Sequence, residues 1–352
     1  MKTLYLVSSE PYSGKGWLSL MLLSKCKQSG LKIGYYRPVG TMPVKVDGIT
    51  TDEDMMYINN ILKLGLDNDI LGSTVFLAEE IIESFLRATD KDLQAPALAA
   101  FKKVSKDKDL VVVGGAGCFF FAGSVFGLSP TKLAELFDAK VLLTFKYKTE
   151  LVDSVIAAKH VLGSRMVGVV INAIPEDKLD LVQNHLIPFL EKNEISVFGA
   201  IPYDRVLSSV SVEELQNTLN AEIICGQDKL DGLVEHFCIG AMHTESALKY
   251  FRQVVNKTVI TGGDRTDIQL AALETPTTCL VLTGYIRPNP IILSKAESVG
   301  VPLLLVKDDT LTTVEKIERM LGKLPVRGEK KLKSAQQLFD KYFAYDRLMK
   351  LI

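Results

Sequence analysis

The opening of the chain constrains its fold most strongly, because an apolar run at 4–7 passes through a polar turn into an apolar-periodic helix. The turn reads Ser-Ser-Glu-Pro-Tyr-Ser-Gly-Lys-Gly at 8–16. It is close to the pattern G-x-x-x-x-G-K-[ST], in which backbone N–H groups and a helix N-terminus surround a phosphate and the lysine adds a positive charge. Ser9 replaces the first glycine, and Gly16 replaces the hydroxyl residue that holds Mg²⁺. The turn therefore predicts a phosphate-binding P-loop that lacks one metal ligand.

Short runs rich in Val, Ile and Leu then alternate with helical patterns, which is typical of βαβ units and a mostly parallel sheet. The runs are continuous rather than alternating, as expected for strands covered on both faces. We predict an α/β fold with strands at 2–8, 31–37, 109–114, 139–145, 166–172 and 195–201.

The length of 352 residues indicates two domains, since a single core stops growing below this size. The pattern loosens after Pro202 into a serine-rich stretch, so we predict a P-loop domain over 1–205 and a smaller α/β domain over 208–322. Pro325 and Gly328 precede a final helix within 328–352, whose apolar stripe would cover its own domain or a second subunit. The strands expected in the second domain lie at 221–225, 237–241, 257–261, 278–284 and 301–306.

Composition narrows the function classes. A formal net charge of −1 argues against a nucleic-acid partner. No apolar stretch reaches the ~20 residues that span a bilayer, so we expect no membrane partner. The five cysteines are scattered, which predicts reduced thiols rather than a metal site. The chain runs directly into a strand without a signal peptide, and we expect a cytoplasmic protein.

Further polar residues follow the predicted strands, and the carboxyl ends of parallel strands are where open sheets bind ligands. Arg37 follows the second strand, an acidic loop at 52–54 offers Asp52 and Asp54 to Mg²⁺, and Asn172 could read an adenine edge. The candidate nucleotide-binding residues are Ser9, Glu10, Tyr12, Ser13, Gly14, Lys15, Gly16, Trp17, Arg37 and Asn172.

The order of the P-loop, Y-Y-R-P-V-G at 35–40, the acidic loop, V-V-V-G-G-A-G at 111–117 and V-I-N-A-I-P at 170–175 resembles P-loop ATPases of the dethiobiotin synthetase type. The resemblance covers 1–205 and implies that Lys15 binds phosphate, Asp54 binds the metal and Asn172 lies beside adenine. The family's metal-binding Thr and Glu correspond to Gly16 and Gly114, and its substrate-binding Lys corresponds to Arg37. Phosphoryl transfer depends on charge stabilisation by the metal, so this resemblance implies binding with impaired catalysis.

The second domain contains the segment T-G-G-D-R-T-D at 261–267, where a strand ends in a double glycine and Asp264 is expected to cap the next helix. This segment resembles the DRTGG domain, which follows a dethiobiotin synthetase-like domain in the N-terminal half of long bacterial phosphotransacetylases. Too few residues follow Gly322 for the acetyltransferase domain, so the resemblance is to the regulatory half alone. The candidate ligand or interface residues here are Thr261, Gly262, Gly263, Asp264, Arg265 and Thr266.

We therefore expect a regulatory protein with little or no catalysis that binds ATP or another nucleotide and depends weakly on Mg²⁺. The resemblance also implies a homo-oligomer, with a dimer as the simplest form, and a protein partner in acetyl-phosphate metabolism. Two alternatives stay open. One is an ATP-dependent carboligase that uses Lys15, Arg37 and Asp54, and the other is an assembly module that binds no nucleotide.

Overall fold

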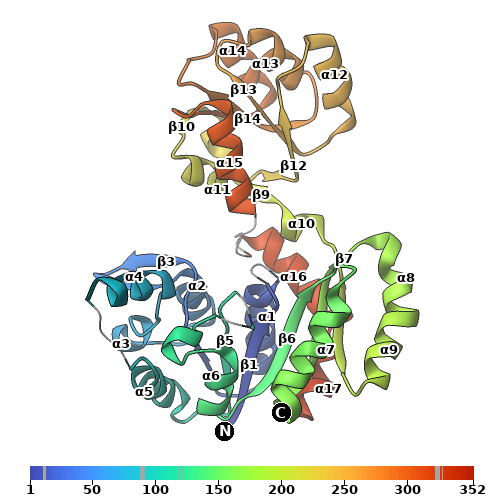
Figure 1. The fold of residues 1–352 in the computed structure, drawn as a ribbon. Coiled ribbons are helices and arrows are strands. Elements are labelled where there is room, and N and C mark those ends of the chain that lie inside the picture. Colours follow the sequence, from blue (N-terminus) through green and yellow to red (C-terminus); the bar gives the residue numbers. More distant parts are fainter. Residues whose placement is uncertain (11–12, 88–91, 118, 121, 322–325, 327) are drawn as a thin grey trace. The chain divides into compact units, whose positions relative to one another are not determined.

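The chain divides into two compact α/β units, one of Met1–Tyr203 with Ala335–Ile352 and one of Asp204–Ser334 (Figure 1). This confirms the predicted fold class. The computed structural model describes residues 1–10, 13–87, 92–117, 119–120, 122–321, 326 and 328–352.

The first unit is built on a parallel six-stranded sheet with the order β2-β5-β1-β6-β7-β8. Every residue of β2 and β5 is buried, as are most residues of the other strands, because helices cover both faces. All six strands predicted for this region are present. They are β1 (Lys2–Ser8), β2 (Ile33–Tyr36), β5 (Leu110–Gly114), β6 (Lys140–Lys146), β7 (Met166–Ile174) and β8 (Val197–Pro202).

From β1 the chain first runs toward β2 at one edge of the sheet and later, from β5, toward β8 at the other edge. The covering helices therefore lie on different faces. The connection from β1 to β2 places α1 on one face, while the connections toward β8 place α6 and α7 on the other (Figure 1). The carboxyl ends of β1 and its neighbours therefore form the switch point where open sheets bind ligands. The helices are α1 (Lys15–Gln28), α2 (Glu53–Leu62), α3 (Asn68–Leu71), α4 (Leu77–Arg87), α5 (Gln94–Ser105), α6 (Pro130–Leu136), α7 (Leu151–Leu162), α8 (Leu179–Leu181) and α9 (Ile187–Lys192).

The segment between β2 and α2 differs from the prediction. A hairpin of β3 (Pro43–Val46) and β4 (Ile49–Asp52) precedes α2, so the expected acidic loop is a strand end followed at once by a helix start. Asp52 is the N-cap of α2 and accepts a hydrogen bond from the amide of Asp54. The sequence pattern did not predict the hairpin or this cap, because the acidic run at 52–54 contains both the last residue of β4 and the start of α2.

The second unit contains a five-stranded sheet with the order β10-β15-β14-β13-β12, in which only the pair of β10 and β15 is antiparallel. Its strand residues alternate between two cores. Val259 and Leu280 face the core with α12 and α13, whereas Ile260 and Val281 face the core with α11 and α15. The strands are β10 (Glu222–Cys225), β12 (His236–Ile239), β13 (Lys257–Gly262), β14 (Thr277–Thr283) and β15 (Leu303–Leu305), with a short pair of β9 (Val210–Ser211) and β11 (Leu233–Val234). The helices are α10 (Arg205–Ser208), α11 (Val212–Leu219), α12 (Thr244–Gln253), α13 (Thr266–Leu273), α14 (Pro290–Val299) and α15 (Thr310–Leu321).

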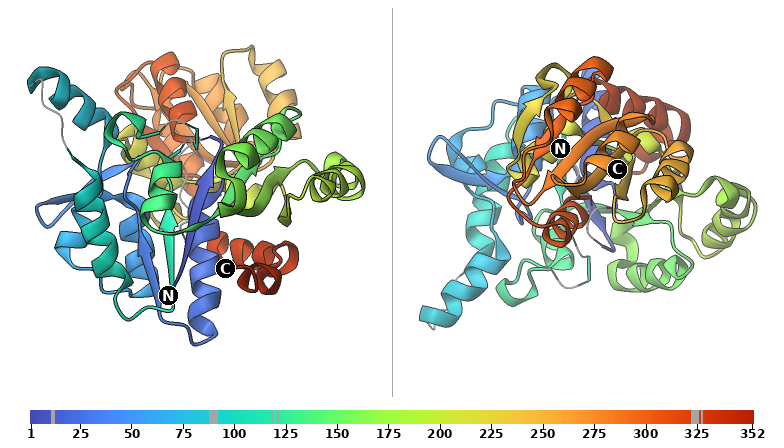
Figure 2. Two further views of the ribbon diagram at one scale, coloured as in Figure 1. Left: turned by 60° about the horizontal axis from the view of Figure 1, so that its bottom comes forward. Right: turned by 90° about the horizontal axis from the view of Figure 1, so that it is seen from above.

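The C-terminal segment belongs largely to the first unit. From Ala335 on, α16 (Glu329–Tyr342) and α17 (Tyr345–Met349) are part of that unit, and they lie beside α1 (Figure 2). The apolar stripe predicted for this helix is buried there through Ala335, Leu338 and Phe339. The stripe therefore packs within the chain, on the P-loop unit rather than on the domain that precedes it in sequence. Among the described residues, no helix has the length and apolar character needed to cross a membrane.

Candidate functional site

The P-loop begins where β1 ends, at Ser8, and leads into the first turn of α1. Gly14 is the N-cap of α1 with φ of +98°, a conformation that favours glycine. A Cβ atom there would also overlap the side-chain amide of Asn172. The first backbone amides of any helix lack intrahelical partners, so the start of α1 supplies donors for an anion.

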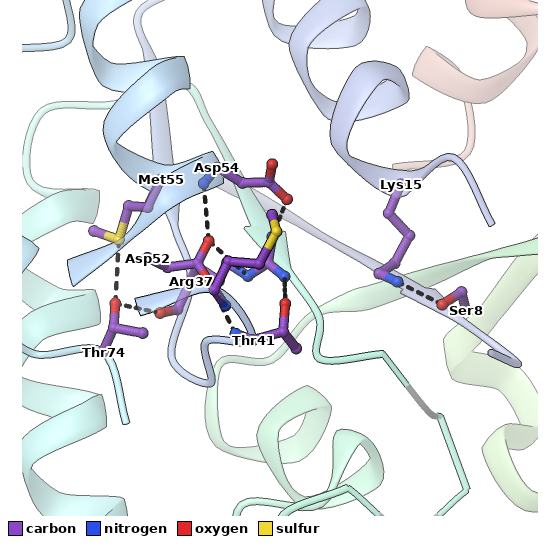
Figure 3. A network of polar contacts seen from close by, with 9 residues as sticks. Ser8, Lys15, Arg37, Thr41, Asp52, Asp54, Met55 and Thr74 are labelled. Atoms are coloured by element: carbon purple, nitrogen blue, oxygen red, sulfur yellow. Dashed lines mark hydrogen bonds and ion pairs between the residues drawn. The ribbon is translucent and has the colours of Figure 1, made fainter. Parts of the chain in front are cut away.

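Lys15 is the first residue of α1, and its side chain is directed toward the end of β1 (Figure 3). Its Nζ lies 2.5 Å from the hydroxyl oxygen of Ser8, and the residue is only 8% exposed. The Ser8 hydroxyl in turn donates to the carbonyl of Glu10 at 2.6 Å, and Ser13 Oγ donates to the same carbonyl at 2.8 Å. These bonds link Ser8, Glu10 and Ser13 and place the lysine ammonium beside the end of β1.

The other predicted loop residues lie around this turn. Ser9 is half-buried, and the Glu10 carboxylate forms an ion pair with Lys148. Trp17 is buried in the first turn of α1. Tyr12 lies outside the described residues.

Asn172 on β7 contacts the P-loop directly. Its Nδ2 donates to the carbonyl of Ser13 at 3.0 Å, and the side chain is half-buried. The structure thus brings Asn172 and the loop together across the sheet edge, and its bond holds the loop backbone. Its contact with an adenine remains a prediction.

Arg37 lies at the centre of a buried polar cluster with Asp52 and Asp54 (Figure 3). Its Nη1 is 2.5 Å from Asp54 Oδ2, its Nη2 donates to Thr41 Oγ1 at 2.9 Å, and its Nε lies 3.3 Å from Asp52 Oδ1 without hydrogen-bond geometry. Burial acts to lower the pKa of Arg37, but the two carboxylates outweigh it and raise that pKa. The guanidinium is therefore permanently charged and held from three sides.

Asp52 is committed to the backbone. It is fully buried, and its Oδ2 accepts from the amides of Thr41 at 2.8 Å and Met42 at 3.1 Å, while Oδ1 accepts from the amide of Asp54 at 3.0 Å. These bonds occupy the carboxylate with the hairpin and the start of α2. Of the two predicted metal ligands, only Asp54 retains partial exposure.

The residues present do not fit a magnesium site of the resembled type. Gly16 and Gly114 offer no side-chain oxygen, and a Cβ at Gly114 would overlap the hydroxyl of the buried Tyr35. Burial raises the pKa of Tyr35, and the nearby charge of Arg37 acts in the opposite direction, so this hydroxyl stays neutral. Among the described residues, no group of three His, Cys, Asp or Glu side chains is placed to hold a metal.

The predicted site of the second unit lies where β13 passes into α13. Thr261 is buried at the end of β13, and the carbonyl of Gly262 accepts from Gln269 Nε2 at 2.8 Å. The expected cap is wrong: α13 begins at Thr266, which makes Arg265 the N-cap and leaves Asp264 one residue too early to reach the helix amides.

Arg265 forms an ion pair within the same segment, with Asp267 of α13. Arg265 forms two bonds to Asp267, each 3.0 Å long, and donates to the carbonyl of Met242 at 3.3 Å. Gly263 passes so close to Ile286 that a Cβ would overlap its carbonyl oxygen, which explains the glycine by packing alone. The six predicted residues form one turn, and whether they bind a ligand remains a prediction.

Sequence reasoning missed Ser8, Tyr35 and Thr41, which hold Lys15 and Arg37 or exclude a side chain at position 114. Ser8 could have been identified from the sequence, since it is the last residue of an apolar strand. The structure shows that it is completely buried. Tyr35 and Thr41 gave none, because their partners are distant in sequence or separated by a turn.

Comparison with known families assigns both units. A family model described as an AAA domain matches residues 2–211, and one described as a DRTGG domain matches residues 214–320.

Curated relatives match nearly the whole chain. A phosphate acetyltransferase from Synechocystis sp. is 25% identical and covers 99% of this chain and 51% of its own length. A phosphate acetyltransferase from Nitratidesulfovibrio vulgaris is 25% identical over 96% of this chain and 50% of its own length. The chain thus spans about half the length of these relatives. An ATP-dependent dethiobiotin synthetase from Caldicellulosiruptor bescii is 25% identical over 33% of this chain and 49% of its own length.

Proposed function

Since the chain belongs to the AAA domain family and carries a DRTGG domain behind its P-loop unit, we propose that it binds a nucleotide and has a regulatory role. The observation that carries this proposal is the P-loop itself. Gly14 begins α1 with a positive φ and lies so close to Asn172 that a Cβ would overlap its amide, and the Lys15 ammonium donates to the Ser8 hydroxyl. A lysine and a helix N-terminus at a sheet switch point are a chemically complete phosphate cradle.

Regulation rather than turnover is supported by the same site. Phosphoryl transfer needs cationic stabilisation of the transferred group, and Mg²⁺ usually supplies it through protein and phosphate oxygens. Two of the expected metal positions are glycines, and the carboxylate of Asp52 is engaged with backbone amides. We therefore propose little or no catalysis and at most weak dependence on Mg²⁺.

The ligand is ATP or another nucleotide, and calorimetry with ATP, ADP and GTP, each with Mg²⁺ and with EDTA, tests the proposal. We expect saturable binding of at least one nucleotide in both buffers. If the protein binds neither these nucleotides nor inorganic phosphate, the result would favour the alternative of an assembly module that binds no nucleotide. ATP turnover above background would favour the carboligase alternative, which the partial similarity to a dethiobiotin synthetase supports.

The similarity to phosphate acetyltransferases suggests the setting of this role. We propose a cytoplasmic homo-oligomer that acts with a partner in acetyl-phosphate metabolism, and that the turn at Thr261–Thr266 contributes a ligand or subunit contact. Cross-linking in extracts, followed by mass spectrometry of the captured protein, tests whether such a partner exists.

A further inference from the structure

The misfit between this P-loop and a magnesium ion has a definite structural cause. The carboxylate of Asp54 is already beside the start of α1, because a Cβ on Gly16 would lie 3.3 Å and 3.5 Å from its two oxygens. This carboxylate is not vacant: its Oδ2 is 2.5 Å from Nη1 of Arg37. The cation beside the Asp54 carboxylate is thus the guanidinium of Arg37.

The guanidinium is a built feature rather than a surface contact. Arg37 is 4% exposed, and Asp52, Asp54 and Thr41 hold it from β4, α2 and the β2–β3 connection. Thr74 also fixes its backbone, since the Thr74 hydroxyl donates to the Arg37 carbonyl at 2.9 Å. A buried arginine with two carboxylates cannot lose its proton and needs no dehydration to act as a local charge.

The two glycines make room for this arrangement. At position 16 the absent side chain leaves space in front of Asp54, and at position 114 it leaves space for the hydroxyl of Tyr35. Tyr35 is close enough to Arg37 for the guanidinium charge to act on its pKa. The changes at 16, 37 and 114 are therefore parts of one cluster.

We propose that the guanidinium of Arg37 takes the place of the divalent cation, so that this P-loop binds its phosphate ligand free of metal. The inference rests on the proposed nucleotide site and deepens it by naming the form of the ligand: a nucleoside phosphate, or another phosphate ester, without bound Mg²⁺. In the free protein Asp54 neutralises Arg37, and the ligand's phosphate competes with that carboxylate for the guanidinium.

Calorimetry with ATP tests the proposal in the full-length protein. The wild type should bind ATP in EDTA, and Mg²⁺ should leave that affinity unchanged or lower it, because Mg²⁺ competes with the guanidinium for the phosphate. Asp54→Asn removes the competing negative charge and should strengthen binding in EDTA by roughly threefold or more, whereas a metal ligand at this position would weaken binding in Mg²⁺. Arg37→Gln should weaken binding in EDTA by roughly 10- to 100-fold. Arg347→Gln, which removes an exposed arginine of the same unit, is the matched control.

Two features keep the test decisive. If Arg37→Gln does not fold, Asp54→Asn still preserves the pair of Arg37 with Asp52. Titration with Mn²⁺ alone, followed by electron paramagnetic resonance, needs no nucleotide and should give equally weak binding in wild type and Asp54→Asn. A tight Mn²⁺ site that Asp54→Asn abolishes, or ATP binding only with Mg²⁺, would overturn the inference while leaving the proposed function intact. Absence of binding by the wild type in both buffers would overturn both.

Discussion

At the scale of single residues, the first unit contains two buried cationic side chains, each held by polar partners. Lys15 and Arg37 lie in separate clusters beside the switch point of the sheet, one held by a hydroxyl and the other by two carboxylates (Figure 3). Removing one partner from a buried cluster costs more than removing an exposed charge, because the remaining group is left without compensation. Substitutions here must therefore be compared with matched exposed residues.

Lys15→Met should weaken nucleotide binding by roughly 10- to 100-fold, because it removes the charge that meets the phosphate and keeps most of the stem volume. Calorimetry measures the affinity, and circular dichroism checks the fold. Lys140→Met is the control, since Lys140 is exposed at the opposite end of the sheet, where β6 begins. Equal affinities in wild type and Lys15→Met would contradict the P-loop assignment.

Gly114→Ala should lower the free energy of unfolding by about 1–3 kcal/mol, because the added methyl overlaps the Tyr35 hydroxyl in a packed core. Combining it with Tyr35→Phe should recover part of that loss, since the overlapping oxygen is gone. Urea unfolding of the two single variants and the double variant forms the cycle. Strictly additive effects would show that the hydroxyl is not the obstacle.

Lys257 predicts a pH dependence of stability in the second unit. The residue is fully buried, its Nζ donates to the carbonyls of Val254 at 3.1 Å and Pro276 at 2.8 Å, and burial lowers its pKa to about 8. The unfolded chain has the higher pKa and binds the proton more tightly, so this lysine destabilises the fold below pH ~8 and progressively less up to pH ~10.5.

The stability of the wild type relative to Lys257→Met should therefore increase between pH 8 and pH 10. The comparison cancels groups such as Cys279 and Tyr36, whose raised pKa values act in the opposite direction over this range. Urea unfolding at several pH values measures it. A difference that stays constant with pH would contradict the lowered pKa.

At the scale of elements, the C-terminal helices act as a structural cover of the P-loop unit. The Tyr345 hydroxyl donates to Cys26 Sγ at 3.5 Å, and Arg347 lies over the ring of Phe198 at 5.4 Å. Lys25 at the end of α1 also pairs with Asp340 of α16 at 3.5 Å. These contacts tie the C-terminal segment to α1, whose first turn belongs to the P-loop, and to β8.

Leu348→Ala should lower the free energy of unfolding by about 2–4 kcal/mol, because Leu348 is completely buried in α17. Leu351→Ala, at a side chain that is 50% exposed, should change it little. Thermal unfolding of both variants distinguishes them. Equal stabilities would mean that α17 is peripheral to the unit.

At the scale of the whole molecule, the first unit is discontinuous in sequence, whereas the second is a single stretch. The second unit is inserted between Tyr203 and Ala335 of the first. A fragment that ends at 205 would therefore lack α17 and expose the surface that it covers, so oligomer tests need the full chain.

The full chain should form a dimer, with a mass near twice 38.8 kDa by light scattering at micromolar concentration. The expectation now rests on the resemblance to phosphotransacetylases, because the apolar stripe of α16 is used within the chain. A mass near 38.8 kDa over that concentration range would contradict it.

Sequence alone determined the α/β class, the main strands of both sheets and the position of the P-loop. These features depend on local signals, since apolar runs, helix periodicity and glycine at a positive-φ turn act over a few residues. The family resemblance likewise located Lys15, Asp54 and Asn172 as candidates, and their roles in binding stay predictions.

Only the tertiary structure decided how those residues are engaged. Arg37 meets Asp52 and Asp54 because a hairpin returns the chain to the end of β2, and Tyr35 reaches position 114 because β2 and β5 pair side by side. The final helix packs on the first unit although it follows the second in sequence. The burial of a side chain and the identity of its partners arise from contacts between segments that are distant in sequence. An apolar stripe or a charged residue does not by itself specify which surface it will contact.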